Sequence, residues 1–275
     1  MKKINLPKDL IDFYKKNQST LEENYPGFNQ VVLLRFIDDL GLERYQAEKE
    51  SIEAKLLRAV PLEYITNKKF FYDCDLFVNE KVLIPRYETE ILVDEAIKFA
   101  KSNRIRNFID IGTGSGAIFI NVLKALPKIE TAIATDIDQN ALDICKRNLA
   151  ALSTSAEVHL KLADRFKGIR QKFDMILSNP PYIKEVADKN GVHFQADSYE
   201  PHLALYLKDV EYDAWFDDFF KQSVDNLNNN GLFMMEGHED HLQSLALKLD
   251  SLRVGKVQVL KDLAGRDRFI KLIKE

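Results

Sequence analysis

The strongest constraint on the fold is the alternation of short apolar runs with helical patterns from about residue 88 onward. The runs that read as buried strands cover 107–111, 131–135, 157–161, 173–178, 231–236, 254–260 and 268–273. Strand–helix alternation favours a parallel, doubly wound α/β sheet. The link KDLAGRD between the last two runs is too short for a helical crossover and permits only an antiparallel return. We therefore predict a seven-stranded, mostly parallel sheet whose last strand is antiparallel.

The first quarter of the chain has a different pattern. Up to about residue 66, apolar residues recur at spacings of three and four, which predicts helices. Residues 70–84 read as a β-hairpin that turns near Asp73–Asp75, followed by an extended piece stopped by Pro85. We assign 1–68 to a helical domain, 69–87 to a hairpin linker and 88–275 to the sheet domain. The helical domain either stabilises the rest or docks a partner.

Composition excludes several classes of protein. The chain has 275 residues, of which 45% are hydrophobic and 30% charged, as in an ordinary soluble protein. A net charge of −4 disfavours a protein that mainly grips nucleic acid. We see no apolar run of roughly 18 residues and no signal peptide. Cys74 and Cys145 lie far apart, which disfavours a disulfide framework. We expect a cytoplasmic, monomeric protein without membrane contact.

Three glycines mark the turn after the first predicted strand of the sheet. In FIDIGTGSGAIFI, Gly112, Gly114 and Gly116 allow a tight turn and let the backbone approach a ligand at a helix N-terminus. Asp136 ends the next predicted strand, where a carboxylate accepts hydrogen bonds from a ribose. Its alternative role is to cap the following helix, which Asp138 fits better. Together these features predict a nucleoside-containing ligand.

The turn and its charges favour S-adenosylmethionine over a dinucleotide as that ligand. The turn carries G-x-G-x-G and not the full G-x-G-x-x-G of dinucleotide-binding folds. Asp110 precedes the turn, where a carboxylate repels a pyrophosphate and attracts an ammonium or sulfonium group. Asp164 follows the third predicted strand and can accept from an adenine amino group, although a solvated loop acid is an equal alternative.

The stretch LSNPPYI ends the predicted strand at 173–178. Pro180 and Pro181 remove two consecutive N–H donors, so the strand must stop. The corner lies at the carboxyl edge of the sheet beside the glycine turn. Asn179 Oδ1 and the Pro180 carbonyl can accept both hydrogens of a planar –NH2 group, and Tyr182 can cover its face. We predict that Asn179, Pro180 and Tyr182 carry methyl transfer to such a nitrogen without a separate base; the alternative is a rigid loop.

With both motifs in hand, the chain resembles the HemK/PrmC family of protein-(glutamine-N5) methyltransferases, the bacterial release factor glutamine methyltransferases. The resemblance runs from about residue 35 to the end. The matching stretches are PLEYI at 61–65, VLIPRYETE at 82–90, DIGTGSGAI at 110–118, SNPPYI at 178–183, YEPHLAL at 199–205 and KDLAGRDRF at 261–269. The resemblance implies a class I S-adenosylmethionine-dependent methyltransferase fold. It also implies that the substrate is the glutamine in the Gly-Gly-Gln motif of peptide chain release factors, which the N-terminal helical domain helps to dock.

The resemblance also implies roles for individual residues. The implied cofactor contacts are Gly112, Thr113, Gly114, Ser115, Gly116, Asp136, Arg165 and Asn179. The implied contacts with the substrate glutamine are Asn179, Pro180, Pro181 and Tyr182. Arg86 and Glu88 lie in the matching block at 82–90. Either they line the site or they form an inter-domain salt bridge.

Three stretches depart from the family pattern. Tyr87 replaces a usual second proline, and YLKDVEYDAW at 206–215 lacks the glycines common there, which should reshape that loop and affect substrate choice. The family's Glu-Ile-Gly becomes EGHEDH at 236–241. Glu236, His238 and His241 are residue types that bind metals. We expect them to be solvated on a polar loop and predict no metal site.

Several other functions compete with this interpretation. A methyltransferase acting on an amino group of a nucleic-acid base would need a basic face and a target-recognition segment, and neither is evident. A methyltransferase acting on a ribosomal protein glutamine would use the same chemistry. A non-catalytic module that keeps the pocket is disfavoured by the intact NPPY. An NAD-dependent oxidoreductase would need an acid or base beside the nicotinamide, and none is placed.

Overall fold

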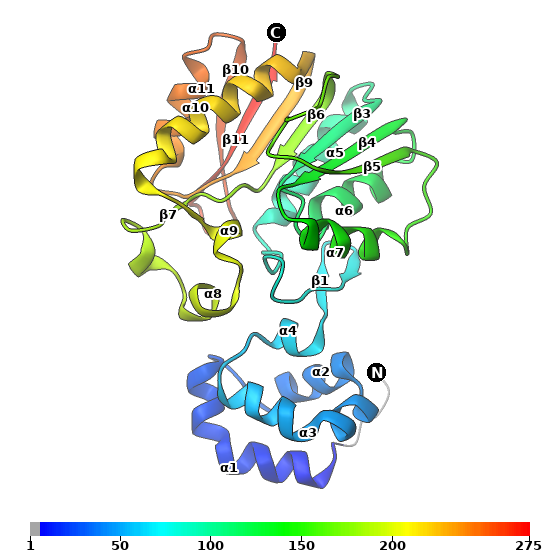
Figure 1. The fold of residues 1–275 in the computed structure, drawn as a ribbon, viewed down its shortest axis with the longest axis vertical. Coiled ribbons are helices and arrows are strands. Elements are labelled where there is room, and N and C mark those ends of the chain that lie inside the picture. Colours follow the sequence, from blue (N-terminus) through cyan, green and yellow to red (C-terminus); the bar gives the residue numbers. More distant parts are fainter. Residues whose placement is uncertain (1–5) are drawn as a thin grey trace.

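The computed structural model describes residues 6–275, and its largest element is a seven-stranded sheet (Figure 1). The strands follow in the spatial order β10-β11-β9-β6-β3-β4-β5. Their bounds are β3 Asn107–Ile111, β4 Thr131–Asp136, β5 Glu157–Leu162, β6 Phe173–Ser178, β9 Leu227–Glu236, β10 Gly255–Lys261 and β11 Asp267–Lys274. Each of the seven predicted strands is present near its expected position, and the central strands are buried by helices and neighbouring strands.

Strand direction in this sheet agrees with the prediction. β9, β6, β3, β4 and β5 pair in parallel, whereas β11 runs antiparallel to both of its neighbours, β9 and β10. The antiparallel strand therefore lies one position in from the edge. The return from β10 to β11 is tight because Asp262 accepts hydrogen bonds from the backbone N–H groups of Ala264 and Arg266, both at 2.9 Å. The mostly parallel sheet with an antiparallel last strand is confirmed.

Helices cover both faces of the sheet. Successive strand residues point to opposite faces, so Phe108 and Ile109 pack into two separate apolar clusters. The helices on the first face are α5 Thr89–Ser102, α6 Ala117–Ala125 and α7 Gln139–Leu149, and those on the second are α10 Asp209–Asn226 and α11 Leu242–Asp250. Within residues 6–275, no helix combines the length and the apolar character that crossing a membrane requires.

Four helices at one end of the molecule form a separate unit (Figure 1). They are α1 Lys8–Asn24, α2 Gln30–Leu40, α3 Leu42–Leu57 and α4 Leu62–Thr66. Asn29 begins α2 by accepting from the N–H of Val31 at 2.9 Å, and Gly41, with φ of 86°, separates α2 from α3. Their apolar residues pack around a cluster of their own. Residues 1–5 of the helical domain expected at 1–68 lie outside the described residues.

The predicted hairpin follows these helices but turns earlier than expected. β1 Lys69–Phe71 pairs with β2 Cys74–Leu76, so Cys74 already lies in the second strand. The turn is formed by Tyr72, with φ of 55°, and Asp73. Lys124 of α6 donates to the Asp73 carbonyl at 2.7 Å, which fixes the hairpin against the sheet unit. The turn is shorter than predicted because two residues suffice to reverse the chain.

The segment between β6 and α10 connects the carboxyl edge of the sheet with the helical unit. It contains β7 Ile183–Lys184, a 3₁₀ turn at Lys189–Gly191, α8 Phe194–Tyr199, α9 His202–Leu205 and β8 Tyr206–Leu207. Gln195 Nε2 donates to the Ala59 carbonyl at 2.9 Å, and the Tyr199 hydroxyl donates to the Arg58 carbonyl. Where the sequence departs from the family at 206–215, β8 leads directly into α10.

Candidate active site

The glycine turn joins the end of β3 to the start of α6. Gly112, Gly114 and Gly116 have φ values of 71°, 53° and 84°, a left-handed conformation that glycine adopts without steric cost. A Cβ on Gly116 would lie 2.8 Å from Cys145 Sγ and 2.9 Å from Ile120 Cδ1. Gly116 therefore permits close packing beneath the turn, while Gly112 and Gly114 shape its exposed side.

Asp136 holds the turn from the end of β4. Its Oδ2 accepts from the N–H of Gly114 at 2.9 Å, and its Oδ1 accepts from the N–H of Asp138 at 3.0 Å. Burial raises the pKa of Asp136, although these backbone N–H groups oppose the shift. Asp138 accepts from the N–H of Asn140 at 2.9 Å and caps α7. The cap thus belongs to Asp138, which leaves Asp136 at the turn.

A cavity of about 420 Å³ lies over this turn, and we call it the glycine cavity. Its walls include Gly112, Thr113, Gly114, Ser115, Asp136, Asp164, Arg165, Asn179, Pro180 and Pro181. A volume of this size is typical of a site for a small organic molecule or cofactor. Of the residues expected at the cofactor, Asp110 and Gly116 do not line it. Gly116 instead packs against α7, where Cys145 is its neighbour.

Asp110 lies behind the turn and not in the cavity, so its expected contact with a bound cation is corrected. Its side chain is fully buried, and its Oδ2 accepts from the Thr113 hydroxyl at 2.8 Å. Its Oδ1 has no hydrogen-bond partner within residues 6–275. Burial raises the pKa of Asp110 to about 7. The physical reason is the strand alternation, which directs residue 110 to the face covered by α5 and α6.

Asp164 and Arg165 form the far wall of the glycine cavity. Arg165 Nε lies 3.0 Å from Asp164 Oδ1, and its Nη1 lies 2.8 Å from Asp218 Oδ2 on α10. The Arg165 guanidinium carbon lies 5.1 Å from the ring centroid of Trp215, within cation–π range. These contacts hold Arg165 in place while Asp164 keeps an exposed carboxylate at the cavity.

The Asn-Pro-Pro-Tyr corner follows β6, and its asparagine is held in one orientation. Asn179 Nδ2 donates to Thr89 Oγ1 and to Glu236 Oε2, both at 3.1 Å. Thr89 Oγ1 and Glu236 Oε2 are themselves 2.6 Å apart, so they lie on the same side of Nδ2, and Oδ1 is the atom that can accept from a ligand. Pro180 and Pro181 line the glycine cavity beside it.

Glu236 is a functional residue that the sequence reasoning missed. It is buried, with 1% of its surface exposed, and accepts from the Thr89 hydroxyl at 2.6 Å and the Tyr182 hydroxyl at 3.0 Å. Burial raises the pKa of Glu236, which these hydrogen bonds oppose. The expectation that it is solvated on a polar loop is wrong, because β9 continues through residue 236. Ser178 pairs with Met235, so the sheet register brings Glu236 beside Asn179.

A second cavity of about 590 Å³ lies on the other side of the corner. We call it the arginine cavity, because its walls include Arg86, Arg266 and Arg268, together with Glu88, Asn179, Tyr182 and Glu200. Asn179 lines both cavities. A ligand group in the arginine cavity can therefore reach the same amide that borders the glycine cavity.

Arg86 combines the two alternatives that the sequence left open. It lines the arginine cavity, and its Nη2 lies 2.6 Å from Glu200 Oε1. Glu200 is buried, with 5% of its surface exposed, and also accepts from the N–H of Ile84 at 3.1 Å. Despite the cost of burial, the charge of Glu200 raises the pKa of Arg86, so Arg86 stays protonated. The ion pair fixes the cavity wall.

Comparison with known proteins identifies the family of the chain. The family model of the methyltransferase small domain matches residues 88–195. A release factor glutamine methyltransferase from Flavobacterium psychrophilum is 32% identical over 238 residues, covering 85% of this chain and 83% of the relative. One from Leptospira interrogans is 31% identical over 291 residues, covering 98% of this chain and 99% of the relative. The chain belongs to the release factor glutamine methyltransferase family.

Membership of the release factor glutamine methyltransferase family makes the chain a methyltransferase, and its fold agrees. The crystal structure of a methyltransferase from Pyrococcus furiosus is similar with a TM-score of 0.50 at 18% identity, covering 85% of this chain and 98% of that one. This likeness concerns the fold alone. The glycine turn at 112–116 and the asparagine corner at 179–182 both fall within the range of the matched family model.

Proposed function

We propose that the protein transfers a methyl group from S-adenosylmethionine to the side-chain amide nitrogen, N5, of the glutamine in the Gly-Gly-Gln motif of peptide chain release factors. The observation that carries this proposal is the Asn179 amide, which borders both cavities and is oriented by Thr89 and Glu236. The names of the relatives at 31–36% identity support the class of substrate.

The residues of the glycine cavity fit S-adenosylmethionine. Each Asp136 oxygen accepts one backbone N–H and keeps lone-pair capacity for a ribose hydroxyl. Asp164 offers an exposed carboxylate to an adenine amino group, and the Gly112–Ser115 backbone lies open to the cavity. When bound, S-adenosylmethionine supplies a methyl carbon activated by a positively charged sulfur.

The chain's own part in the transfer is to hold the glutamine amide. Asn179 Oδ1 and the Pro180 carbonyl accept its two hydrogens. This arrangement orients the nitrogen lone pair and raises electron density on an otherwise poor nucleophile. Pro180 and Pro181 offer no N–H that would compete for the amide. We propose no separate general base, since the alkylated nitrogen is acidic enough to lose a proton to solvent.

Tyr182 limits the position of the amide from one side. Its hydroxyl donates to Glu236, so the ring is anchored at its far end and its face is available to cover a planar group. Burial, together with the nearby charge of Glu236, raises the pKa of Tyr182, so the phenol stays neutral. Asn179, Pro180 and Tyr182 are therefore the proposed catalytic residues, and Pro181 completes the contact with the substrate.

The release factor is proposed to approach through the arginine cavity. Arg86 and Glu88 line its walls, and the helical unit lies at the end of the molecule nearest to α8, which also borders this cavity. Gln195 and Tyr199 connect α8 with the carbonyls of Ala59 and Arg58. We propose that residues 1–68 form a docking domain, which the linker at 69–87 joins to the methyltransferase domain at 88–275.

The deciding experiment supplies purified protein with methyl-labelled S-adenosylmethionine and one of three acceptors: a release factor, ribosomal protein or nucleic acid. We expect label in the release factor and its loss when the glutamine of the Gly-Gly-Gln motif is changed to alanine. Label in ribosomal protein or nucleic acid, with none in the factor, would overturn the proposed substrate.

A further inference from the structure

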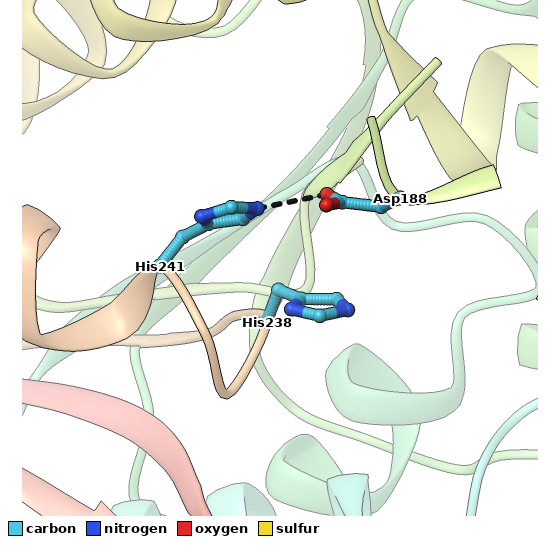
Figure 2. A group of neighbouring side chains, drawn as sticks. All are labelled: Asp188, His238 and His241. Atoms are coloured by element: carbon cyan, nitrogen blue, oxygen red, sulfur yellow. Dashed lines mark hydrogen bonds and ion pairs between the residues drawn. The ribbon is translucent and has the colours of Figure 1, made fainter. Parts of the chain in front are cut away.

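Three side chains that the proposed transfer does not use converge beside the arginine cavity: Asp188, His238 and His241 (Figure 2). One nitrogen or oxygen from each lies within 4.8 Å of the others. Their side chains are 11%, 24% and 18% exposed, respectively. Half-buried imidazoles and a carboxylate at such separations form a donor set that binds transition metals in proteins.

The chain brings the two histidines together by a local turn. His238 and His241 are three residues apart, and the His238 carbonyl accepts from the N–H groups of His241 and Leu242, both at 3.0 Å. Residues at this spacing lie on the same side of a helical turn. The ring centroids are 5.2 Å apart, and Figure 2 shows both rings beside the Asp188 carboxylate.

Asp188 comes from the other loop and is held in position independently. Its Oδ2 accepts from the N–H of Lys184 at 2.8 Å and lies 2.8 Å from His241 Nε2. Within residues 6–275 it has no ion pair with a lysine or arginine. The backbone contact therefore fixes the carboxylate, and its second oxygen, Oδ1, keeps coordination capacity.

A simple ion pair between Asp188 and His241 does not account for His238. His238 Nδ1 accepts from the N–H of Asp240 at 3.3 Å, and its Nε2 has no hydrogen-bond partner within the described part of the chain. Two protonated imidazoles this close would repel each other. A cation shared by both rings and the carboxylate uses all three side chains.

We propose that Asp188, His238 and His241 bind one divalent transition metal ion, of which zinc is the representative. Two imidazole nitrogens and one carboxylate oxygen form a three-ligand set that suits zinc and leaves a position for water or a ligand. Binding replaces the hydrogen bond between Asp188 and His241, and each imidazole coordinates in its neutral form. Both histidines lie in the stretch EGHEDH at 236–241, directly after the end of β9.

The ion would tie together two loops that form one wall of the arginine cavity. Asp188 and His238 both line this cavity. Asp188 belongs to the segment that follows Tyr182, and His238 lies two residues after Glu236. The site thus stabilises the surroundings of the asparagine corner. It is independent of the proposed substrate, because zinc binding requires neither methyl donor nor release factor.

The test uses the full chain, free of any histidine tag and treated with a chelator. Zinc is titrated in competition with a chromophoric chelator, and cobalt is added separately to record its visible absorption. We expect one zinc ion to bind per chain. We also expect the bound cobalt to show the visible absorption of an ion with few ligands. His238→Ala and His241→Ala should each weaken zinc binding by at least about 100-fold, more than loss of an outer contact would.

The matched control is His159→Ala, because His159 lies on β5 and pairs with Glu157, away from both cavities. It should bind zinc as the unmodified chain does. Circular dichroism without metal confirms that each variant is folded, and zinc should raise the melting temperature of the unmodified chain and of His159→Ala only. Absence of one-to-one binding in the unmodified chain, or unchanged affinity in the double variant of His238 and His241, would overturn the proposal.

Discussion

The two cavities that meet at Asn179 are built in different ways. The glycine cavity includes one locally encoded wall, the backbone of Gly112–Ser115, which one carboxylate from the next strand holds in place. The arginine cavity is assembled by side-chain contacts between distant segments. Its wall holds the ion pair of Arg86 and Glu200, which are 114 positions apart, and the Asn179 amide that it shares with the glycine cavity is held by Thr89 and Glu236, which are 147 positions apart. We therefore expect the locally encoded wall to suit one common methyl donor, whereas the cavity proposed to receive the acceptor depends on contacts across the whole fold.

The largest effect is expected at the residue that both cavities share. Asn179→Ala removes the acceptor for the substrate amide, and loss of one such oriented group costs about 10²–10³ in kcat. Binding of S-adenosylmethionine should change little, since the Asp136 contacts remain. Steady-state kinetics and equilibrium binding separate the two quantities. Asn103→Ala, at the exposed end of α5, is the control. If Asn179→Ala chiefly weakened donor binding, Asn179 would serve the methyl donor and not the substrate amide, and the prediction would be wrong.

The second prediction concerns the long-range network that orients Asn179, the residue that both cavities share. Glu236→Leu removes both oxygens that hold Thr89, Asn179 and Tyr182, so the Asn179 amide keeps Thr89 as its one partner among these residues and is held less firmly. Loss of hydrogen bonds to a charged group costs about 1.5–3 kcal/mol, which corresponds to roughly 10- to 150-fold in kcat. Glu236→Gln keeps an oxygen that can accept from Asn179 and should retain more activity. Equal loss in both variants would mean that charge, and not orientation, is what Glu236 provides.

The difference between local and long-range contacts also explains which features could be predicted from the sequence. The central strands were predictable because their apolar runs are buried, as Phe173 and Met175 show. The glycine turn was predictable because its geometry is local. Asp136 was predicted to end a strand and Asp138 to cap the helix that follows, and the structure puts Asp136 at the end of β4 and the helix cap on Asp138.

The rest depended on contacts that no short stretch encodes. Glu236 meets Asn179 only through the register of β9 against β6. The signal that could have found it was a carboxylate at the end of a buried run, the same signal that identified Asp136. Asp110 was expected to act as a charge that attracts the ligand. It is instead fully buried and accepts a hydrogen bond from the Thr113 hydroxyl. Asp188 approaches His241 across 53 positions, which spacing alone cannot reveal.

The third prediction tests whether backbone shape sets the glycine cavity. Gly116→Ala places a Cβ 2.8 Å from Cys145 Sγ, whereas a Cβ on Gly114 meets nothing within 4 Å. Both positions have positive φ, so the difference between the two variants isolates the packing clash. Overpacking of this kind costs about 1–3 kcal/mol. Urea unfolding should therefore show a larger loss of stability for Gly116→Ala, and equal losses would contradict the packing role of Gly116.

The fourth prediction addresses donor binding. Asp136→Ala removes the carboxylate that holds the N–H groups of Gly114 and Asp138 and that is proposed to accept from the ribose. A hydrogen bond to a charged group is worth about 1.5 kcal/mol or more, so donor affinity should fall by roughly tenfold. At saturating donor, kcat should be nearly unchanged, which is the reverse of the Asn179→Ala pattern. Asp143→Ala, exposed on α7, is the control. A fall in kcat with unchanged affinity would contradict the separation of the two halves.

The smallest expected effect is a pH dependence of the stability that arises from Asp110, behind the glycine turn. Burial raises the pKa of Asp110 to about 7, above its value in the unfolded chain, so the folded state binds a proton that the unfolded state releases. Stability is therefore lost as pH rises through about 7, by roughly 1 kcal/mol between about pH 6 and 8. Asp110→Asn cannot ionise and should lack this component. Urea unfolding of both proteins at the two pH values measures it, and identical pH slopes would show that Asp110 is already ionised in the folded protein.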